Sequence, residues 1–390
     1  MAATIQTYLQ ALKTQFLDLL RNQVNVGSGP LYNMIKSTEK NIEAYQVIKS
    51  APYGINGGAG AGPDDGALPV SGENKYQQFQ SSIKNYYGTI RIGDKVMKAS
   101  KSKKGAFVDA MVAEMEGIKN ACTFIYGRDI HLTSSGVLAT CEASGGAVTT
   151  FNVSDTRYLI EGLTIDILAD GAFTPILNGQ QRRIIGIDRA TNTITIEGAD
   201  QVTTAGTELI VTQGSYNRAL TGLNEIFQST GMLYNVLRDT TPWMVPLMDN
   251  AFGVVSDAKI QAKIAEIEDF RGGKVNYIGV ASDVEGSYMT YLESTRRNVN
   301  TMKVSGGYSA IDFKGTPMKR DRFLQPGTMD MLDTTQFTLH VLSDWDWITD
   351  VAGNILQPVA GTAAYVGALA KYAELICDHP GAQCRNTGVQ

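Results

Sequence analysis

Residues 54–74 have the sequence GINGGAGAGPDDGALPVSGEN, and this stretch decides how the chain must fold. Seven of its 21 residues are glycine and few of its side chains can be buried, so we expect it to be mobile in an isolated chain. The next residues, 76–100, alternate apolar and polar positions around a Gly93-Asp94 turn, which predicts an extended hairpin. Such a loop cannot bury itself within one chain. Neighbouring copies are therefore expected to cover it.

Helical periodicity flanks this loop on both sides. Between Thr4 and Val24 the apolar residues fall on one helical face, so an amphipathic helix that needs a partner is predicted there. A second helical stretch is predicted from Leu31 to about Ser50. Residues 104–130 carry one apolar stripe and predict the longest helix, of roughly 25 residues and about 38 Å.

The remaining chain alternates between strand and helix patterns. Short alternating runs between Thr149 and Thr212, separated by turn residues, predict a small antiparallel barrel. Residues 257–270 and 286–297 are helical by period and flank a buried strand at 274–282, which indicates a mixed sheet with helical cover. Strand patterns return from Met302 to Trp347. Residues 362–377 are compatible with a helix or with a long strand.

Composition excludes several classes of protein. The chain has 390 residues, which predicts two or three packed units, and 43% hydrophobic against 19% charged residues exclude disorder of the whole chain. The net charge of −5 gives no long-range field for gathering nucleic acid. The four cysteines form no CxxC pair, so a reducing compartment is expected. Neither a secretory signal nor a membrane-spanning run is apparent, and no membrane partner is expected.

A search for catalytic or metal-binding motifs yields nothing. The histidines His131, His340 and His379 lie far apart without a metal-like partner, and we assign them no role. The glycine run at 57–66 lacks the GK[ST] ending of a phosphate loop. We therefore expect no enzyme activity, no cofactor and no metal. A run of lysines between residues 95 and 104 is either a solvated face or a contact with an acidic neighbour or a phosphate surface.

The order of parts resembles the major capsid protein of tailed bacteriophages, whose fold is named after phage Hong Kong 97. Four stretches carry the resemblance in sequence order: NACTFIYGRDIHLTSSGVLA from Asn120, GMLYNVLRDTTPWMVPLMDN from Gly231, SAIDFKGTPMKRDRFLQPGTMDMLDTTQFTL from Ser309 and AYVGALAKYAELICDHPGAQCRNTGV from Ala364. It covers most of the chain outside the barrel. The implied fold is α+β.

The resemblance also implies an assignment of segments. Residues 1–50 would form the N-arm, 51–95 the E-loop, and 96–148 the part of the peripheral (P) domain with the long spine helix. An inserted β-barrel would follow at 149–213, the axial (A) domain at 214–334, and P-domain strands at 335–378. Residues 379–390 would return to the A-domain. The barrel departs from the simplest members of the family.

The implied function is structural. Copies of the chain would assemble as pentamers and hexamers into an icosahedral head shell around double-stranded DNA, touching the DNA only weakly and without sequence preference. A separate scaffolding protein, a portal and a decoration protein are the further partners that the resemblance suggests. The shell would be built in the host bacterial cytoplasm and end in the virion. The alternatives are an encapsulin-like compartment, a tail structural protein or an enzyme.

The candidate subunit contacts come from the arm, the loop and the lysine run. They are Leu9, Leu12, Phe16, Tyr76, Phe79, Lys84, Lys98 and Lys101. Some members of the family join an E-loop lysine covalently to a P-domain asparagine. Lys75 and Lys84 lie in or near the loop, but no partner motif is identifiable, so covalent linkage is not expected.

Overall fold

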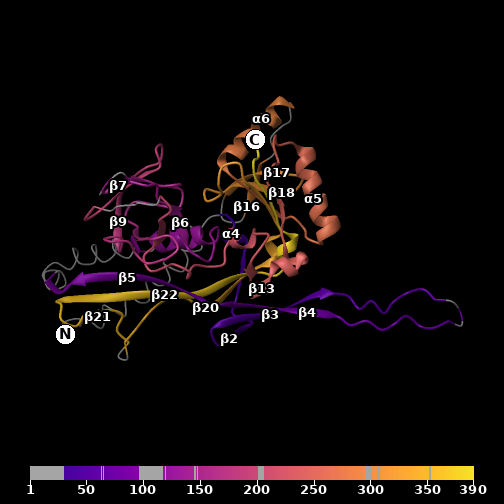
Figure 1. Ribbon diagram of the computed structural model, residues 1–390, viewed down its shortest axis with the longest axis horizontal. Helices are drawn as coiled ribbons and strands as arrows, with labels where there is room; N and C mark the ends of the chain where they lie inside the picture. Colours follow the sequence, from indigo (N-terminus) through magenta and orange to yellow (C-terminus); the bar gives the residue numbers. More distant parts are fainter. Residues whose placement is uncertain are drawn as a thin grey trace.

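The computed structural model describes residues 30–62, 64, 66–95, 117–118, 120–144, 146, 148–200, 206–295, 301–304, 308–350 and 353–390. The predicted arm helix with Leu9, Leu12 and Phe16 lies outside these ranges, as do Lys98, Lys101 and the first part of the predicted long helix. Residues 120–129 of that helix are described and are helical. The described chain forms four sheets of three or more strands and one two-stranded sheet, with three longer helices that cover them (Figure 1).

The first sheet is built around one long central strand. β22 (Ala364–Cys377) pairs antiparallel with β5 (Lys84–Gly93) on one side, and with β20 (Phe337–Trp347) and β21 (Gln357–Pro358) on the other. β1 (Lys36–Thr38) adds in parallel to β20. Residues 362–377, which the sequence left open between helix and strand, are thus a strand. Trp345 and Trp347 pack in the core beneath it.

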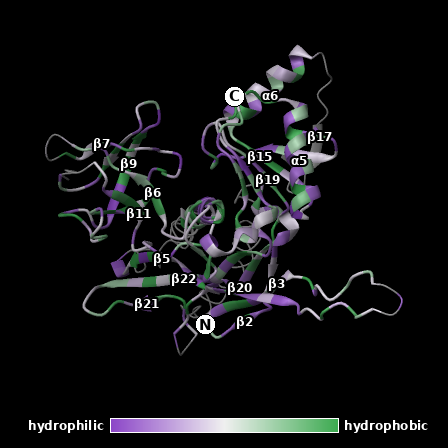
Figure 2. Ribbon diagram, turned by 45° about the vertical axis from the view of Figure 1, so that its right-hand side comes forward, coloured by the Kyte–Doolittle hydropathy of each residue, from purple (hydrophilic) through white to green (hydrophobic). Residues whose placement is uncertain are grey.

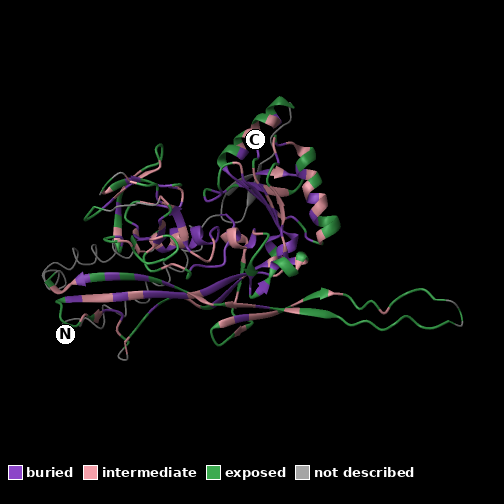
Figure 3. Cartoon of the chain, viewed as in Figure 1, coloured by how far each residue is buried: buried purple, intermediate pink, exposed green. Residues whose placement is uncertain are grey.

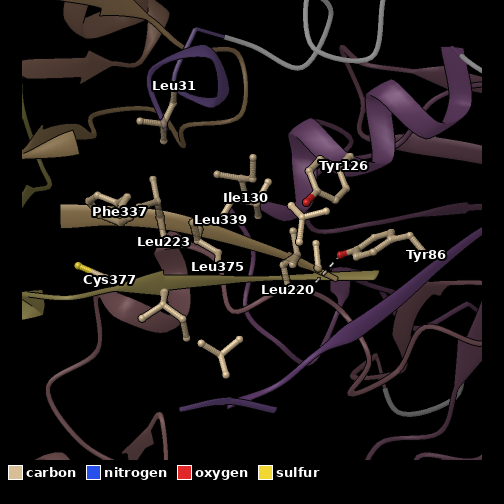
Figure 4. Close-up of a cluster of buried hydrophobic side chains, with 14 of the residues drawn as sticks. Leu31, Tyr86, Tyr126, Ile130, Leu220, Leu223, Phe337, Leu339, Leu375 and Cys377 are labelled. Atoms are coloured by element: carbon tan, nitrogen blue, oxygen red, sulfur yellow. Dashed lines mark hydrogen bonds between the residues drawn. The ribbon is translucent and has the colours of Figure 1, made fainter. Parts of the chain in front are cut away.

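The helix at 120–129 lies against this sheet and shares its core. Tyr126 and Ile130 pack with Leu339 and Leu375 in one buried cluster (Figure 4). The close approach requires a glycine at position 88 of β5. A Cβ there would lie 3.0 Å from the Cδ1 atom of Ile118, tighter than packed atoms normally allow.

The second sheet is a long hairpin that projects away from the body (Figure 1). β3 (Gln46–Gly54) and β4 (Lys75–Ser82) pair antiparallel, and β2 (Ile42–Glu43) pairs with the start of β3. The predicted helix at 31–50 is therefore wrong. The segment holds only the short 3-10 helix η1 (Tyr32–Met34) followed by strands, and Asn41 and Ala44 have positive φ angles that no helix tolerates.

The hairpin predicted around the Gly93-Asp94 turn has its second arm beyond residue 95, outside the described residues, so its pairing stays a prediction. The part before the turn is two strands and not one. β4 pairs with β3, and β5 pairs with β22, so the two strands run into different sheets. One residue, Ile83, separates them. This leaves no room for a reversal of the chain, because the shortest common hairpin loops have two residues. The glycine-rich stretch between β3 and β4 connects the two strands of the projecting hairpin.

The third sheet has six strands and closes on itself. Its strands are β6 (Val137–Thr140), β7 (Thr150–Asn152), β8 (Thr164–Leu168), β9 (Arg182–Asp188), β10 (Thr193–Ile196) and β11 (Leu209–Thr212), in the order β6-β11-β8-β9-β10-β7. The two end strands meet through a bridge between Cys141 and Val153, and the N–H of Ser154 donates to the carbonyl oxygen of Thr140 at 2.9 Å. β6 precedes the predicted barrel boundary at residue 149, so the closed sheet starts earlier than expected.

The fourth sheet forms the upper unit, which holds the C-terminus (Figure 1). Its seven strands in spatial order are β14 (Leu247–Asp249), β23 (Cys384–Asn386), β19 (Met329–Leu332), β15 (Tyr277–Val280), β18 (Thr316–Arg320), β17 (Tyr308–Phe313) and β16 (Thr301–Val304). Short elements connect it to the body: α4 (Leu223–Ile226), β12 (Met232–Leu233), β13 (Val236–Leu237), η2 (Arg238–Thr240), η3 (Pro242–Met244), η4 (Thr334–Gln336) and η5 (Pro380–Ala382).

The predicted helices of this unit are α5 (Asp257–Arg271) and α6 (Ser282–Ser294). The Oγ of Ser256 caps α5 by accepting from the N–H of Lys259, and Gly272 ends it in the left-handed conformation. Figure 2 shows apolar and polar residues mixed along α5, and Ile260, Ile264 and Ile267 supply its buried stripe. Local caps and a regular apolar period thus explain why α5 lies where the sequence predicts it, whereas α6 has no side-chain cap and begins four residues before the predicted start at 286.

Candidate assembly interface

The tip of the projecting hairpin exposes apolar side chains. Residues 55–62 and 67–74 have no regular secondary structure, and Ile55, Leu68 and Val70 are 90%, 88% and 88% exposed. Figure 3 shows almost all of the described residues in the outer part of the hairpin as exposed. Isolated exposed apolar residues are ordinary, but Leu68 and Val70 close together on a projecting hairpin form a surface suited to another molecule. Ile55 lies nearer the root, where it lines a groove together with Trp243.

Glycines allow the two arms of the tip to approach closely. The Oδ1 of Asn56 accepts from the N–H of Gly58 at 2.9 Å and from the N–H of Gly72 on the opposite arm at 3.1 Å. A Cβ on Gly72 would lie only 2.6 Å from the backbone nitrogen of Gly57. Backbone contact between the arms therefore requires glycine at position 72 and leaves little room at position 58, whereas Gly57, Gly60 and Gly62 have space for a Cβ.

The root of the hairpin is fastened by aromatic stacking. Tyr53 stacks on Trp243 with ring centroids 5.3 Å apart and an interplanar angle of 6°, and Phe79 stacks on the same indole at 6.2 Å. Phe79 also contacts Tyr234 at 5.7 Å, and the N–H of Gln80 donates to the carbonyl oxygen of Tyr234 at 2.9 Å. Such aromatic pairs add about 1 kcal/mol each beyond their buried area.

An ion pair and a groove lie beside this aromatic stack. The Nζ of Lys49 on β3 is 2.6 Å from the Oδ1 of Asp378, directly after β22. The groove has a volume of about 620 Å³ and is lined by the hairpin root and by the base of the upper unit, including Trp243 and His379. The root of the hairpin is therefore attached to two parts of the body, although the tip is attached to neither.

A buried carboxyl lies on the inner side of the same root. Glu374 of β22 is 0% exposed, and its Oε1 accepts from the Oγ of Ser81 on β4 and from the N–H of Thr221, both at 3.3 Å. Burial raises the pKa of Glu374 to about 7, although the nearby cation of Lys84 and the hydrogen bonds act in the opposite direction. The carboxyl thus joins the long sheet, the hairpin and the segment that runs from β11 to α4.

A second buried junction joins the helix at 120–129 to its surroundings. Arg128 pairs with Asp129 at 2.8 Å, and the hydroxyl of Tyr86 on β5 donates to the same carboxylate at 2.9 Å. The Tyr86 oxygen in turn accepts from the N–H of Leu220, as drawn in Figure 4. Arg128 also donates to the hydroxyl of Thr212 at the end of β11. One hydrogen-bonded chain therefore connects three of the structural units.

A third junction connects the residues after this helix to the upper unit. The Nε2 of His131 is 3.2 Å from the Oδ2 of Asp321, and both residues are buried. Burial alone would raise the pKa of Asp321, but the His131 imidazole and the N–H of Phe323 stabilise its carboxylate and leave its pKa lowered. His131, to which the sequence assigned no role, is therefore structural.

The predicted contact residues have different positions. Tyr76 on β4 is 62% exposed, but Phe79 on the same strand is 1% exposed and packs within its own chain. Phe79 is therefore unavailable to a neighbour in this conformation. Lys84 begins β5, and its Nζ donates to the Oγ of Ser82 at 3.2 Å. Leu9, Leu12, Phe16, Lys98 and Lys101 lie outside the described residues.

Sequence reasoning missed the exposed hairpin residues Ile55, Leu68 and Val70, as well as Trp243 and Glu374. A usable signal exists for Glu374. It is one of two charged residues in the otherwise mostly apolar stretch AYVGALAKYAELIC of β22, and a charge in such a strand needs a specific environment. No comparable signal marks the exposed hairpin residues, because their exposure depends on where the hairpin points.

Within the described ranges, no three His, Cys, Asp or Glu side chains are grouped so that they could hold a metal ion. Among the same residues, no helix has the length and apolar character needed to cross a bilayer.

Comparison with known proteins identifies the fold through structure alone. Neither a family model nor a curated protein sequence matches the chain. Among solved structures, a chain of the cyanophage A-1(L) capsid asymmetric unit aligns with a TM-score of 0.58 and 11% identity, over 94% of this chain and 93% of that one. A capsid chain of the native GTA particle aligns with a TM-score of 0.48 and 10% identity, over 93% and 91%. An encapsulin complex from Synechococcus elongatus aligns with a TM-score of 0.45 and 6% identity, over 92% and 87%.

The cyanophage match spans almost all of both chains, so it concerns the whole architecture and not one unit. The match agrees with the α+β fold class that the sequence predicted. In this chain the fold consists of a long hairpin, a helix on a long-stranded sheet and a separate mixed unit. This chain therefore has the Hong Kong 97-type fold of phage capsid proteins.

Proposed function

We propose that this chain is the major capsid protein of a tailed bacteriophage, a structural subunit without catalytic activity. Copies of it would assemble as pentamers and hexamers into an icosahedral shell that encloses packaged double-stranded DNA. The observation that carries the proposal is the hairpin that projects from the body (Figure 1), whose outer part exposes the apolar side chains of Leu68 and Val70. The near-complete structural match to a cyanophage capsid chain supports the same conclusion.

The physical mechanism is mutual covering of incomplete surfaces. A tip that cannot reach its own body must contact a different patch on a neighbour, and such heterologous contacts close into rings or shells when the rotation between copies permits. Each contact can be weak because every copy makes several, and the effective concentration rises once part of a ring exists. Removing apolar tip atoms from water stabilises the contact by about 25 cal/mol for each Å² buried.

The segments have corresponding roles in this proposal. Residues 1–50 act as the N-arm, 51–95 as the E-loop, 96–136 and 335–378 as the P-domain, 137–213 as an inserted closed sheet that includes β6, and 214–334 with 379–390 as the A-domain. A separate scaffolding protein, a portal and a decoration protein are the further partners. Assembly takes place in the host cytoplasm and the product is the virion. The net charge of −5 favours weak and non-specific contact with the packaged DNA.

Electron microscopy of the purified chain, alone and with a candidate scaffolding protein, tests the proposal. The wild type should form closed shells, and the double variant Leu68→Ser/Val70→Ser should form few or none while keeping its circular dichroism spectrum. Leu177→Ser is the matched control, because Leu177 is 86% exposed on the closed six-stranded sheet. If the tip variant assembles as well as the control, the hairpin is not the assembly element.

The contents of the particle separate the proposal from its nearest alternative. Particles from the native source should contain double-stranded DNA that nuclease cannot reach. Particles that hold a protein cargo and no DNA would instead support an encapsulin-like compartment.

A further inference from the structure

Glu374 occupies an unusual position for a carboxyl group. It lies on the central strand β22, is completely buried, and touches the hairpin through Ser81 and the segment before α4 through Thr221. Both hydrogen bonds end on Oε1. Its Oε2 is buried without a hydrogen-bond partner among the described residues. An ionised carboxylate has about four acceptor sites to satisfy, so this environment suits the neutral acid better than the anion.

The ionisable groups around Glu374 do not neutralise it. Lys84 at the start of β5 lowers its pKa from a distance, but the Nζ of Lys84 is hydrogen-bonded to Ser82, and within the described chain Glu374 has no ion-pair partner at 4 Å or less. His340 of β20 stands opposite Glu374 in the strand register. Its Nδ1 contacts the carbonyl oxygen of Lys40, and burial lowers its pKa, so this imidazole resists becoming a cation.

Two tyrosines complete the surroundings. The hydroxyl groups of Tyr126 and Tyr234 are buried, and the charge of a Glu374 carboxylate would help to raise the pKa of each, after the larger effect of burial. Both therefore remain neutral. The hydroxyl of Tyr234 is engaged elsewhere, donating to the carbonyl oxygen of Leu375. Ionisation of Glu374 would thus place one negative charge in the root without a buried cation to balance it.

We propose that Glu374 is a proton-controlled clamp on the hairpin, which holds the root closed when it is neutral and loosens it when it is ionised. The inference rests on the proposed function, since the hairpin matters as the element that contacts neighbouring copies. In the open root, water or Lys84 can reach the carboxylate and stabilise its charge. Ionisation of Glu374 therefore favours the open state over the closed one. The angle at which the hairpin meets a neighbour then becomes adjustable by proton concentration.

The size of the effect follows from the two protonation equilibria. With a pKa of about 7 in the closed root and an ordinary value near 4.5 in the open one, the equilibrium constant for opening rises about tenfold between pH 6 and pH 8. The sign is fixed by the raised pKa. A neutral Glu374 stabilises the closed root at low pH, and this stabilisation is lost as the pH rises through 7.

Hydrogen exchange measured by mass spectrometry on the full, unassembled chain tests the clamp. After correction for the intrinsic pH dependence of exchange, protection of residues 46–54 and 75–82 should fall about tenfold from pH 6 to pH 8 in the wild type. In Glu374→Gln, which keeps an acceptor oxygen but cannot ionise, it should stay constant. Glu43→Gln is the control, because Glu43 is an exposed carboxyl in the same hairpin sheet and its replacement should leave the wild-type response intact.

A second variant keeps the test decisive if Glu374→Gln folds poorly. Ser81→Ala removes one donor to the carboxylate and should move the midpoint of the pH response upward. A wild-type root whose protection does not change with pH, or a Glu374→Gln root that changes as much as the wild type, overturns the clamp. Shell formation is scored separately by electron microscopy, so a chain that assembles but has a pH-independent root refutes only the clamp.

Discussion

Tyr76 and Phe79 lie three residues apart on β4, and the structure gives them opposite roles. Replacing Phe79 with alanine removes a fully buried ring that stacks on Trp243 and touches Tyr234. Truncation of a buried phenylalanine costs about 3–5 kcal/mol, of which the two aromatic contacts supply about 1–3 kcal/mol. Replacing Tyr76, which is mostly exposed, should change the free energy of unfolding by less than about 0.5 kcal/mol.

The assay is urea unfolding of the unassembled chain, followed by circular dichroism and by tryptophan fluorescence. Phe79→Ala should lower the free energy of unfolding of the segment that contains Trp243, whereas Tyr76→Ala should leave it unchanged and impair only shell formation under the electron microscope. A Phe79→Ala variant that loses less than about 1 kcal/mol would show that the hairpin root is not packed as described. The same result would mean that the Phe79 side chain is available to contact a neighbouring copy of the chain.

Three further perturbations have defined outcomes. Asp321→Asn should lower the free energy of unfolding at pH 7 by about 2 kcal/mol and make it less dependent on pH in the acid range. The reason is that the lowered pKa of Asp321 beside His131 supplies stability that is present above the ordinary pKa of an aspartate and is lost as the pH falls through the pKa of the folded state. Thermal melting from pH 2 to pH 7 measures this effect. Gly72→Ala should separate the arms of the tip, since its Cβ has no room, and reduce the yield of shells without changing the melting temperature of the body. Lys49→Met should cost at most about 1 kcal/mol, because its ion pair with Asp378 is partly exposed, and urea unfolding in 1 M salt should nearly abolish the difference from the wild type.

The parts of the fold that sequence predicts are those with local causes. α5 carries its own N-cap at Ser256, its own left-handed C-cap at Gly272 and a regular apolar stripe, so no distant contact is needed to place it. The same applies to the short alternating strands of the closed six-stranded sheet. The order of these elements along the chain was enough to suggest the capsid fold, because that order can be read from the sequence without knowing which elements contact each other.

The failures have non-local causes. The first part of β3, residues 46–50, was predicted to be helical because its partner β4 begins some twenty residues after β3 ends, beyond the reach of any periodicity argument. The strand β22 could not be told from a helix because strands lie on both its sides and most of its residues are buried, which removes the alternation that identifies a half-exposed strand.

The candidate interface likewise has one part that the sequence predicts and one part that it does not. A glycine-rich loop that needs an external partner follows from composition, and the structure gives it a projecting hairpin. Which residues of the hairpin face outward does not follow, since Phe79 and Tyr76 have similar chemistry and differ only in what lies beside them. Glu374 escaped attention because its surroundings come from Ser81 and Thr221, which are remote in sequence.

The closed six-stranded sheet has its entrance and its exit side by side. The chain enters through β6 and leaves through β11, and these two strands are hydrogen-bonded neighbours, with Ala139 opposite Ile210. Adjacent strands are about 5 Å apart, so removal or exchange of everything between them would not stretch the rest of the subunit. The closed sheet is therefore an insertion whose two ends leave the rest of the subunit at neighbouring points. Viral lineages could acquire, lose or replace it without redesigning the shell, and an engineer could use its outward loops to carry foreign peptides.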